Sequence, residues 1–167
     1  MTGNRILAID PGTKMGWAYW DGEQVTSGTE DFSEEVGVSW AAAWWRLRHW
    51  LDDMTEEMGP GIIAFEDQWR IRGKWAPLCW GWQHEILTFC HLRQHDIRPL
   101  VVNAATLKKW ATGDGNATKA AMMWAARARG YDPQTDDEAD ALLIRAWAQE
   151  RLSTDDTDEE VGGDEET

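Results

Sequence analysis

Four acidic residues stand where a sequence can place carboxylates for metal chemistry. Asp10 and Glu66 each end a short apolar run that is typical of a buried strand. Asp137 and Asp140 are three residues apart at the start of a segment with helical periodicity, so they share one helix face. Carboxylate oxygens are the ligands that hard divalent cations prefer. Together the four residues predict a site for such cations.

Each of these carboxylates taken alone also fits a structural role. Asp10 precedes the turn dipeptide Pro11-Gly12, and Asp137 would interact favourably with the positive end of a helix. As a set, four carboxylates held together repel one another, and two divalent cations would relieve that repulsion. Two such ions promote phosphodiester hydrolysis, because one activates a water and the other stabilises the leaving oxygen. We therefore expect two Mg²⁺ per subunit, with Mn²⁺ as a substitute, and no small-molecule cofactor.

Basic and aromatic side chains gather in two segments that could contact nucleic acid. The first segment is the loop after Glu66, and the second flanks a glycine loop at residues 113–115. Cations bind phosphates and aromatic rings stack on bases, although a solvated loop is an alternative for the first segment. The candidates are Trp69, Arg70, Arg72 and Lys74 in the first segment and Lys108, Lys109 and Lys119 in the second.

Periodicity and turn signals predict the elements that position these residues. Strands are expected at residues 5–10, 15–20, 24–28, 62–66 and 98–102. Helices are expected at residues 33–58, 77–94, 103–110, 116–129 and 135–152, the last three capped by Asn103, Asn116 and Thr135. A capping box is expected between Thr135 and Glu138. An antiparallel hairpin followed by alternating strands and helices predicts an α/β fold, with a mixed five-stranded sheet and helices on both faces.

The order of these elements also places the acids. If the strands that end in Asp10 and Glu66 are parallel neighbours, both carboxylates lie at the same edge of the sheet. The helix at residues 77–94 is apolar on more than one face, so we expect it to be buried in the core or at a subunit contact, and we favour the subunit contact.

Charge divides the chain into two parts. The 167 residues carry a net charge of −14, and eight of the 30 acidic residues follow Leu152. We expect one folded domain at residues 1–152, with a net charge of about −6, and a disordered acidic tail at residues 153–167. An acidic domain argues against a nucleic-acid partner, but two divalent cations would reduce its net charge to about −2.

Composition excludes several classes of protein. No uncharged stretch exceeds ten residues, so we expect no membrane span, and no signal peptide is expected because Asp10 interrupts the first apolar run. Two cysteines exclude a disulfide scaffold and a cysteine-ligated zinc cluster. His84, His91 and His95 share a helix face but lack further ligands for zinc. We expect a cytoplasmic protein.

The motifs resemble those of the RuvC family of Holliday-junction resolvases. The resemblance covers residues 5–152 and is carried by ILAIDPGTKMGWA at 6–18, IIAFE at 62–66, NATK at 116–119 and DEADAL at 137–142. It implies an RNase H-like fold and a homodimer that nicks two strands of like polarity symmetrically at a four-way DNA junction.

The resemblance also implies roles for individual residues. Asp10, Glu66, Asp137 and Asp140 match the metal-binding acids of the family. Lys119 matches a lysine near the scissile phosphate, Lys108 matches a basic DNA contact, and Trp69 stands where the family places an aromatic wedge. The 13 tryptophans and the acidic tail are not features of the family, and they indicate a divergent branch, either bacterial or phage-encoded.

Several other functions fit the same residues. One is a nuclease for branched DNA in general, and another is an RNA-processing nuclease that resembles the YqgF group, because Asp10, Gly12 and Gly16 fit its D-x-G-x-x-x-G opening. A third is a DNA-branch binder that has lost catalysis, although all four acids are present. An ATPase-like phosphate binder would need a second lobe, for which 167 residues are too few.

Overall fold

A mixed five-stranded sheet forms the centre of the molecule. The computed structural model describes residues 5–93 and 96–160. The strands are β1 (Ile6–Asp10), β2 (Lys14–Trp20), β3 (Val25–Asp31), β4 (Ile62–Glu66) and β5 (Arg98–Val102), in the order β3-β2-β1-β4-β5. The first three strands form an antiparallel meander, whereas β1, β4 and β5 run parallel. The predicted sheet is confirmed.

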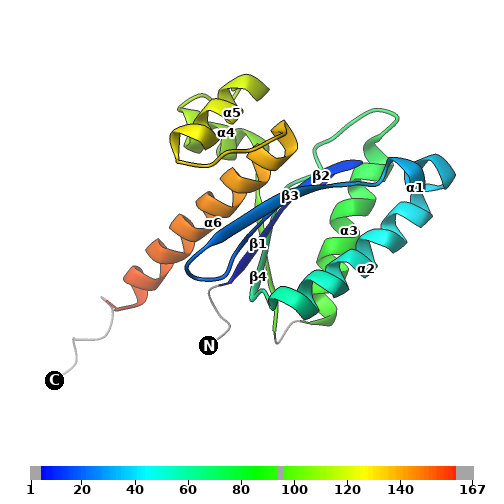
Figure 1. Ribbon diagram of the computed structural model, residues 1–167, viewed down its shortest axis with the longest axis horizontal. Coiled ribbons are helices and arrows are strands. Elements are labelled where there is room, and N and C mark those ends of the chain that lie inside the picture. The colour runs from blue at the N-terminus through cyan, green and yellow to red at the C-terminus, as the bar shows by residue number, and fades with distance from the viewer. Residues whose placement is uncertain (1–4, 94–95, 161–167) are drawn as a thin grey trace.

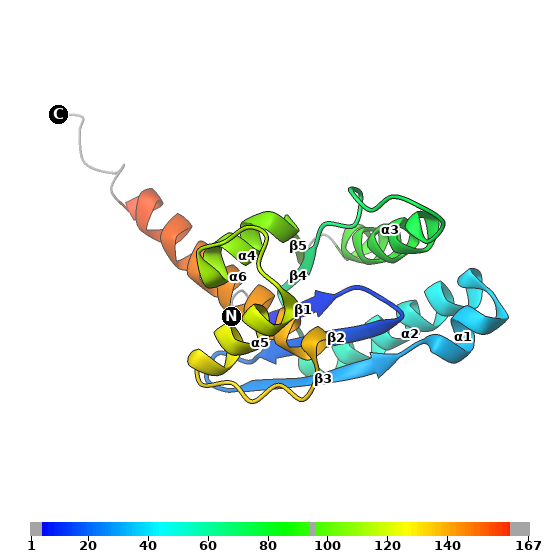
Figure 2. The ribbon, with the colours of Figure 1, turned by 90° about the horizontal axis from the view of Figure 1, so that it is seen from above.

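Helices cover both faces of this sheet (Figures 1 and 2). The helices are α1 (Ser33–Val38), α2 (Trp40–Met58) and α3 (Ala76–Leu92) on one face and α4 (Ala104–Thr112), α5 (Lys119–Ala128) and α6 (Asp136–Glu160) on the other. In the described part of the chain, none of the helices combines the length and the hydropathy that crossing a membrane requires.

Alternate side chains along the strands point to opposite faces of the sheet and belong to two separate hydrophobic cores. In β1, Leu7 and Ile9 belong to the core under α2 and α3, whereas Ile6 and Ala8 belong to the core under α6. Successive side chains of a strand point to opposite faces, so Asp10 lies on the α6 face. The same alternation holds in β4 and places its last residue on that face as well. The fold therefore turns both strand-end carboxylates towards α6.

The segment predicted as one helix at residues 33–58 is two helices, so that prediction is wrong. Ser39 separates α1 from α2 with an extended backbone. Its N–H donates to the Glu35 carbonyl at 2.9 Å, and its hydroxyl accepts from the Ala42 N–H at 3.0 Å. Serine side chains compete well for the free N–H groups at a helix start, which explains the new start here.

Two other predicted helix starts have different outcomes. Asn103 caps α4 as predicted, because its side chain accepts from the Ala105 N–H at 3.0 Å. The helix predicted from residue 116 begins at Lys119 instead, and its cap is the hydroxyl of Thr118. The N–H of residue 116 is held in a turn by the Asp114 carboxylate at 2.9 Å, so the chain enters the helix later.

Helix α6 is longer than the sequence indicates. The periodicity predicts its end at Leu152, and the helix continues to Glu160. Residues 161–167 of the predicted tail lie outside the described residues, as does the predicted end of α3 at residue 94. The tail therefore begins within the last turns of a helix that projects from the body of the molecule (Figure 1).

Candidate functional site

The carboxylates of Asp10 and Glu66 come from neighbouring strands. β1 and β4 are parallel neighbours, with Ile9 opposite Phe65. The next residue of each strand is an acid, so Asp10 and Glu66 lie at the same edge of the sheet. The condition on which the sequence argument depended, that these strands are parallel neighbours, is confirmed. Ligand sites of α/β folds form at this end of parallel strands.

A glycine lets the first turn of α6 approach this edge. Gly16 in β2 pairs directly with Asp10 in β1. A Cβ atom built on Gly16 would lie 1.8 Å from the carbonyl oxygen of Asp137, so no other residue fits without moving the helix. Sequence reasoning did not single out this role, although a glycine inside a strand often marks such a close approach. The sheet acids and the helix acids therefore meet across Gly16.

Three hydrogen bonds fix the start of α6. The Thr135 hydroxyl accepts from the Glu138 N–H at 3.1 Å, which confirms half of the predicted capping box. The Glu138 carboxylate accepts from the Gln134 N–H at 2.7 Å, rather than from the N–H of Thr135. It also accepts from the Ser27 hydroxyl of β3 at 2.7 Å. Glu138 is buried, and its bond to Ser27 holds the start of α6 against β3, the outermost strand of the sheet.

Burial, followed by the charges of nearby carboxylates, raises the pKa values of all four carboxyl groups. Burial, then the charges of Asp140, Glu66 and Asp137, raise the pKa of Asp10 well above its usual value, against the opposing charge of Lys119. Burial and the charge of Asp140 raise the pKa of Glu66 to about 7. Burial first, and neighbouring carboxylates second, raise the pKa of Asp140 to about 6 and the pKa of Asp137 above its usual value. The structure therefore brings the four predicted acids together.

This oxygen-rich cluster fits a hard divalent cation. The Oδ1 atom of Asp140 is buried and has no hydrogen-bond partner among the described residues. Within the described ranges, no group of three or more His, Cys, Asp or Glu side chains is arranged so that it could hold a metal ion. A cation would supply a partner for the buried oxygen and offset the repulsion that raises the pKa values. Ligation of two metals by these residues stays a prediction.

Two of the three predicted lysines act electrostatically on the cluster. Lys119, at the start of α5, forms an ion pair with Asp136, and its side chain is 80% exposed. Its charge lowers the pKa values of Asp10 and Asp140. Lys108 of α4 lowers the pKa values of Glu66 and Asp140. Lys109 is exposed on the same helix. Asp136, the partner of Lys119, is a site residue that sequence reasoning missed.

Buried glutamines anchor the loop that follows β4. The N–H of Gln68 donates to the Gln83 side-chain oxygen of α3 at 2.6 Å, and the Gln68 amide donates to the Glu66 carbonyl at 3.2 Å. The Asp67 N–H donates to the Val102 carbonyl of β5 at 2.8 Å. Both glutamines are at most 3% exposed, which the sequence did not indicate. The base of the loop is therefore fixed beside Glu66.

The far part of this loop carries the predicted basic and aromatic residues. Trp69 is 46% exposed, and Arg72 donates to its carbonyl at 2.7 Å. Arg70 is 4.0 Å from the Asp67 carboxylate and has a side chain that is 79% exposed. The Lys74 ammonium lies 5.4 Å from the centre of the Trp75 ring. The loop therefore presents cations and indole rings together.

This chain is similar to known proteins in its structure but not detectably in its sequence. No protein-family model matches the sequence, and no curated protein is detectably similar to it. RuvC from Thermus thermophilus matches with a TM-score of 0.67 and 19% sequence identity, over 90% of this chain and 97% of that chain. This chain has the RuvC-type RNase H-like fold.

Two further solved structures share the RuvC-type fold. T. thermophilus RuvC in complex with Holliday junction substrate matches with a TM-score of 0.66 and 18% identity, over 88% of this chain and 96% of that chain. The yeast mitochondrial Holliday junction resolvase matches with a TM-score of 0.59 and 14% identity, over 92% and 82% of the chains. At these identities the likeness establishes the fold, and function has to be argued from the site.

Proposed function

We propose that this chain is a Mg²⁺-dependent endonuclease that resolves four-way DNA junctions by paired symmetric nicks. The observation that carries the proposal is the convergence of Asp10 and Glu66, from parallel strand ends, with Asp137 and Asp140 on α6. The RuvC-type fold supports it, since the proteins of similar structure are Holliday junction resolvases and one is in complex with a junction.

The roles of the residues follow from their charges and positions. Asp10, Glu66, Asp137 and Asp140 would hold two Mg²⁺, or Mn²⁺ in their place, and these ions supply an activated water and stabilisation of the leaving oxygen. Lys119 reaches the edge of the cluster with an exposed ammonium group, which can leave Asp136 and neutralise charge on a scissile phosphate. Its ion pair with Asp136 keeps the ammonium near the cluster before DNA binds.

The loop after β4 would grip the branch point. Trp69 offers an exposed ring that can insert at the branch point, and the neighbouring cations Arg70, Arg72 and Lys74 can contact the flanking phosphates. Lys108 and Lys109 on α4 would contact the DNA backbone near Glu66 and Asp140. This assignment draws the cationic contacts from both the loop after β4 and helix α4.

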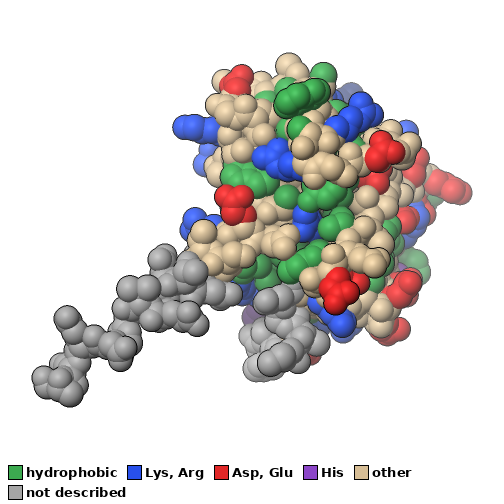
Figure 3. Space-filling view, turned by 60° about the vertical axis from the view of Figure 1, so that its left-hand side comes forward, with side chains coloured by type: hydrophobic (Ala, Val, Ile, Leu, Met, Phe, Trp, Pro, Cys, Tyr) green, Lys and Arg blue, Asp and Glu red, His purple; other side chains and the backbone are tan. Residues whose placement is uncertain are grey.

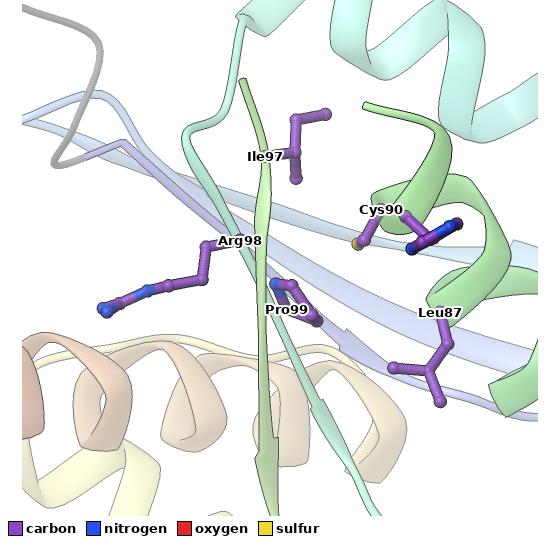
Figure 4. A pocket seen from close by; sticks show the side chains of 6 residues that line it. Leu87, Cys90, Ile97, Arg98 and Pro99 are labelled. Carbon is purple, nitrogen blue, oxygen red and sulfur yellow. The ribbon is translucent and has the colours of Figure 1, made fainter. Parts of the chain in front are cut away.

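A homodimer would match the two-fold symmetry of a four-way junction. One face of α3 is committed to the core, because Leu78, Trp82 and Ile86 are buried. Towards its C-terminal end, α3 borders a cavity of about 480 Å³ next to β5, where the partly buried Leu87 and the buried Cys90 face Pro99 (Figure 4). Nearby Leu92 is 70% exposed. We infer that this end of α3 contributes to the subunit contact.

We also propose that the protein works in the cytoplasm of a bacterium or of a phage host.

The test is incision of an end-labelled immobile four-way junction in Mg²⁺, beside a linear duplex, a 5′ flap and a structured RNA. We expect symmetric nicks in the junction and no cutting of the other three substrates. EDTA should abolish the activity.

Each rival function predicts a different pattern. Equal cutting of junction and flap would replace the proposal with a general branched-DNA nuclease, and cutting of RNA alone would replace it with an RNA-processing nuclease. Junction binding with no incision in Mg²⁺ or Mn²⁺ would leave a DNA-branch binder that has lost catalysis. Any of these three results contradicts the proposed reaction.

A further inference from the structure

A cavity lies between α2 and α3, and Trp69 of the loop after β4 forms part of its wall. Its volume is about 460 Å³, and its lining residues are Trp44, Trp69, Trp80, Gly81, His84 and Glu85. This volume is within the range of sites that bind small aromatic molecules. The lining is mostly apolar, with Glu85 and His84 as the polar exceptions.

Specific packing and polar contacts fix the side chains that form the walls of the cavity. A Cβ atom on Gly81 would lie 2.1 Å from the indole of Trp44, so this glycine lets the ring lie directly against α3. The Trp44 indole N–H donates to the Leu78 carbonyl at 3.3 Å, which holds the ring there. The Glu85 carboxylate is fixed by Arg48 at 2.8 Å.

Two further tryptophans line the same cavity. Trp69 and Trp80 have ring centres 6.4 Å apart and planes inclined by 43°. Neither residue belongs to the two core clusters of the described chain, whereas Trp44 packs against one of them. Several large indole rings that line one hollow form the kind of grouped apolar surface that marks a ligand-binding groove.

The surroundings favour a nucleobase as the occupant. Trp69 is three residues after Glu66 and therefore at most about 11 Å along the chain from the carboxylate cluster. The side chain of Arg70, the residue after Trp69, is 79% exposed, and Arg72 and Lys74 follow on the same loop. Cations beside stacked aromatic rings are the combination that holds single-stranded nucleic acid, since phosphates bind the cations and bases stack on the rings.

We propose that the cavity lined by Trp44, Trp69 and Trp80 captures one unpaired nucleobase that is unstacked at the branch point of the DNA. This assignment depends on the proposed function, because it names where part of the same substrate binds. Trp69 is only three residues after Glu66, so capture of the base would hold the branch point close to the scissile phosphate. Any base offers a flat face, so stacking itself requires no particular sequence.

The experiment measures binding in the Asp10→Asn background, which prevents cleavage. Two four-way junctions are compared, one intact and one with abasic nucleotides at the branch point. Trp80→Leu removes the ring and keeps apolar volume, Trp80→Phe keeps an aromatic face, and Trp45→Ala is the matched control on α2, with a side chain that is 64% exposed outside the cavity.

We expect Trp80→Leu to weaken binding of the intact junction at least about fivefold, as loss of one base-stacking contact implies. It should leave binding of the abasic junction unchanged, Trp80→Phe should restore most of the affinity, and Trp45→Ala should change neither. Equal weakening on both junctions would overturn the cavity assignment alone. Failure of the wild-type chain to prefer junction over duplex would overturn the proposed function, and the assignment with it.

Discussion

The buried carboxylates destabilise the metal-free protein while preparing it to bind cations. Glu66 ends a buried strand, and burial together with the charge of Asp140 raises its pKa to about 7. The pKa of Asp140 rises to about 6 for the same physical reasons. A carboxyl group whose pKa is raised by folding stabilises the native state at low pH, and this contribution disappears as pH rises through the native pKa.

The stability of the metal-free protein should therefore fall between about pH 5 and pH 8. We expect the free energy of unfolding in EDTA to decrease by on the order of 2–4 kcal/mol over this range, because unfolded carboxyl groups release their protons at lower pH. Urea unfolding at the two pH values measures it. Glu66→Gln should remove much of the decrease, and Mn²⁺ should restore stability at pH 8. An equally steep decrease in Glu66→Gln would refute the electrostatic account of this residue.

Lys119 gives a prediction that separates chemistry from stability. Its side chain is 80% exposed, and exposed ion pairs such as that with Asp136 contribute at most about 1 kcal/mol to folding. Lys119→Ala should lower the single-turnover incision rate about 100-fold, because charge on the scissile phosphate loses its partner. Lys119→Arg should recover part of the rate. A wild-type rate in Lys119→Ala would remove this residue from the reaction.

At the scale of secondary-structure elements, the site depends on how closely α6 approaches the sheet. Asp10 and Gly16 pair across β1 and β2, and the carbonyl of Asp137 occupies the space that a side chain at residue 16 would need. The hydrogen bond between Ser27 and Glu138 holds the same turn of α6 against strand β3. Positions of the helix carboxylates are therefore set by backbone packing.

Gly16→Ala should disrupt both the fold and the site. The added methyl group would displace the first turn of α6, and overpacking of this kind destabilises a protein by about 1–3 kcal/mol. We also expect Mn²⁺ to raise the melting temperature less than in the wild type. Gly37→Ala is the matched control, because a Cβ there meets nothing within 4 Å and α1 should gain stability. Unchanged melting and metal response in Gly16→Ala would contradict this packing role.

Local signals in the sequence predict most of the elements but not the contacts between them. The apolar runs that end in Asp10 and Glu66 predict β1 and β4, because a buried strand requires consecutive apolar residues that the sequence shows directly. The break at Ser39 was missed because helical periodicity continues on both sides of it. The hydrogen bond between Gln68 and Gln83 joins residues 15 apart on different elements, so no local pattern reveals it.

At the scale of the whole molecule, charge opposes the proposed substrate. The chain carries a net charge of −14. On the face shown in Figure 3, basic side chains are scattered among apolar and acidic ones rather than gathered in one patch. Binding of an anionic junction therefore has to depend on bound cations and on the few lysines and arginines beside the site.

A chain that ends at Leu152 tests the effect of the acidic C-terminal segment. Leu152 packs against the core, and the truncation removes eight acidic residues that follow it. We expect the shortened chain to bind junction DNA more tightly at low salt, with a smaller gain at high salt because added ions screen the repulsion. Fluorescence anisotropy over a salt series measures both. Equal affinities of the two chains at low salt would show that the segment does not oppose DNA.

The most direct test of the central claim is incision of a four-way junction by the wild-type chain and by Asp10→Asn, in Mg²⁺ and under single-turnover conditions. The variant replaces one carboxylate of the cluster by a neutral group of the same shape. The account predicts symmetric nicks by the wild type, and loss of incision in Asp10→Asn with folding and junction binding retained. Incision by Asp10→Asn at the wild-type rate would show that the carboxylate cluster does not carry the reaction.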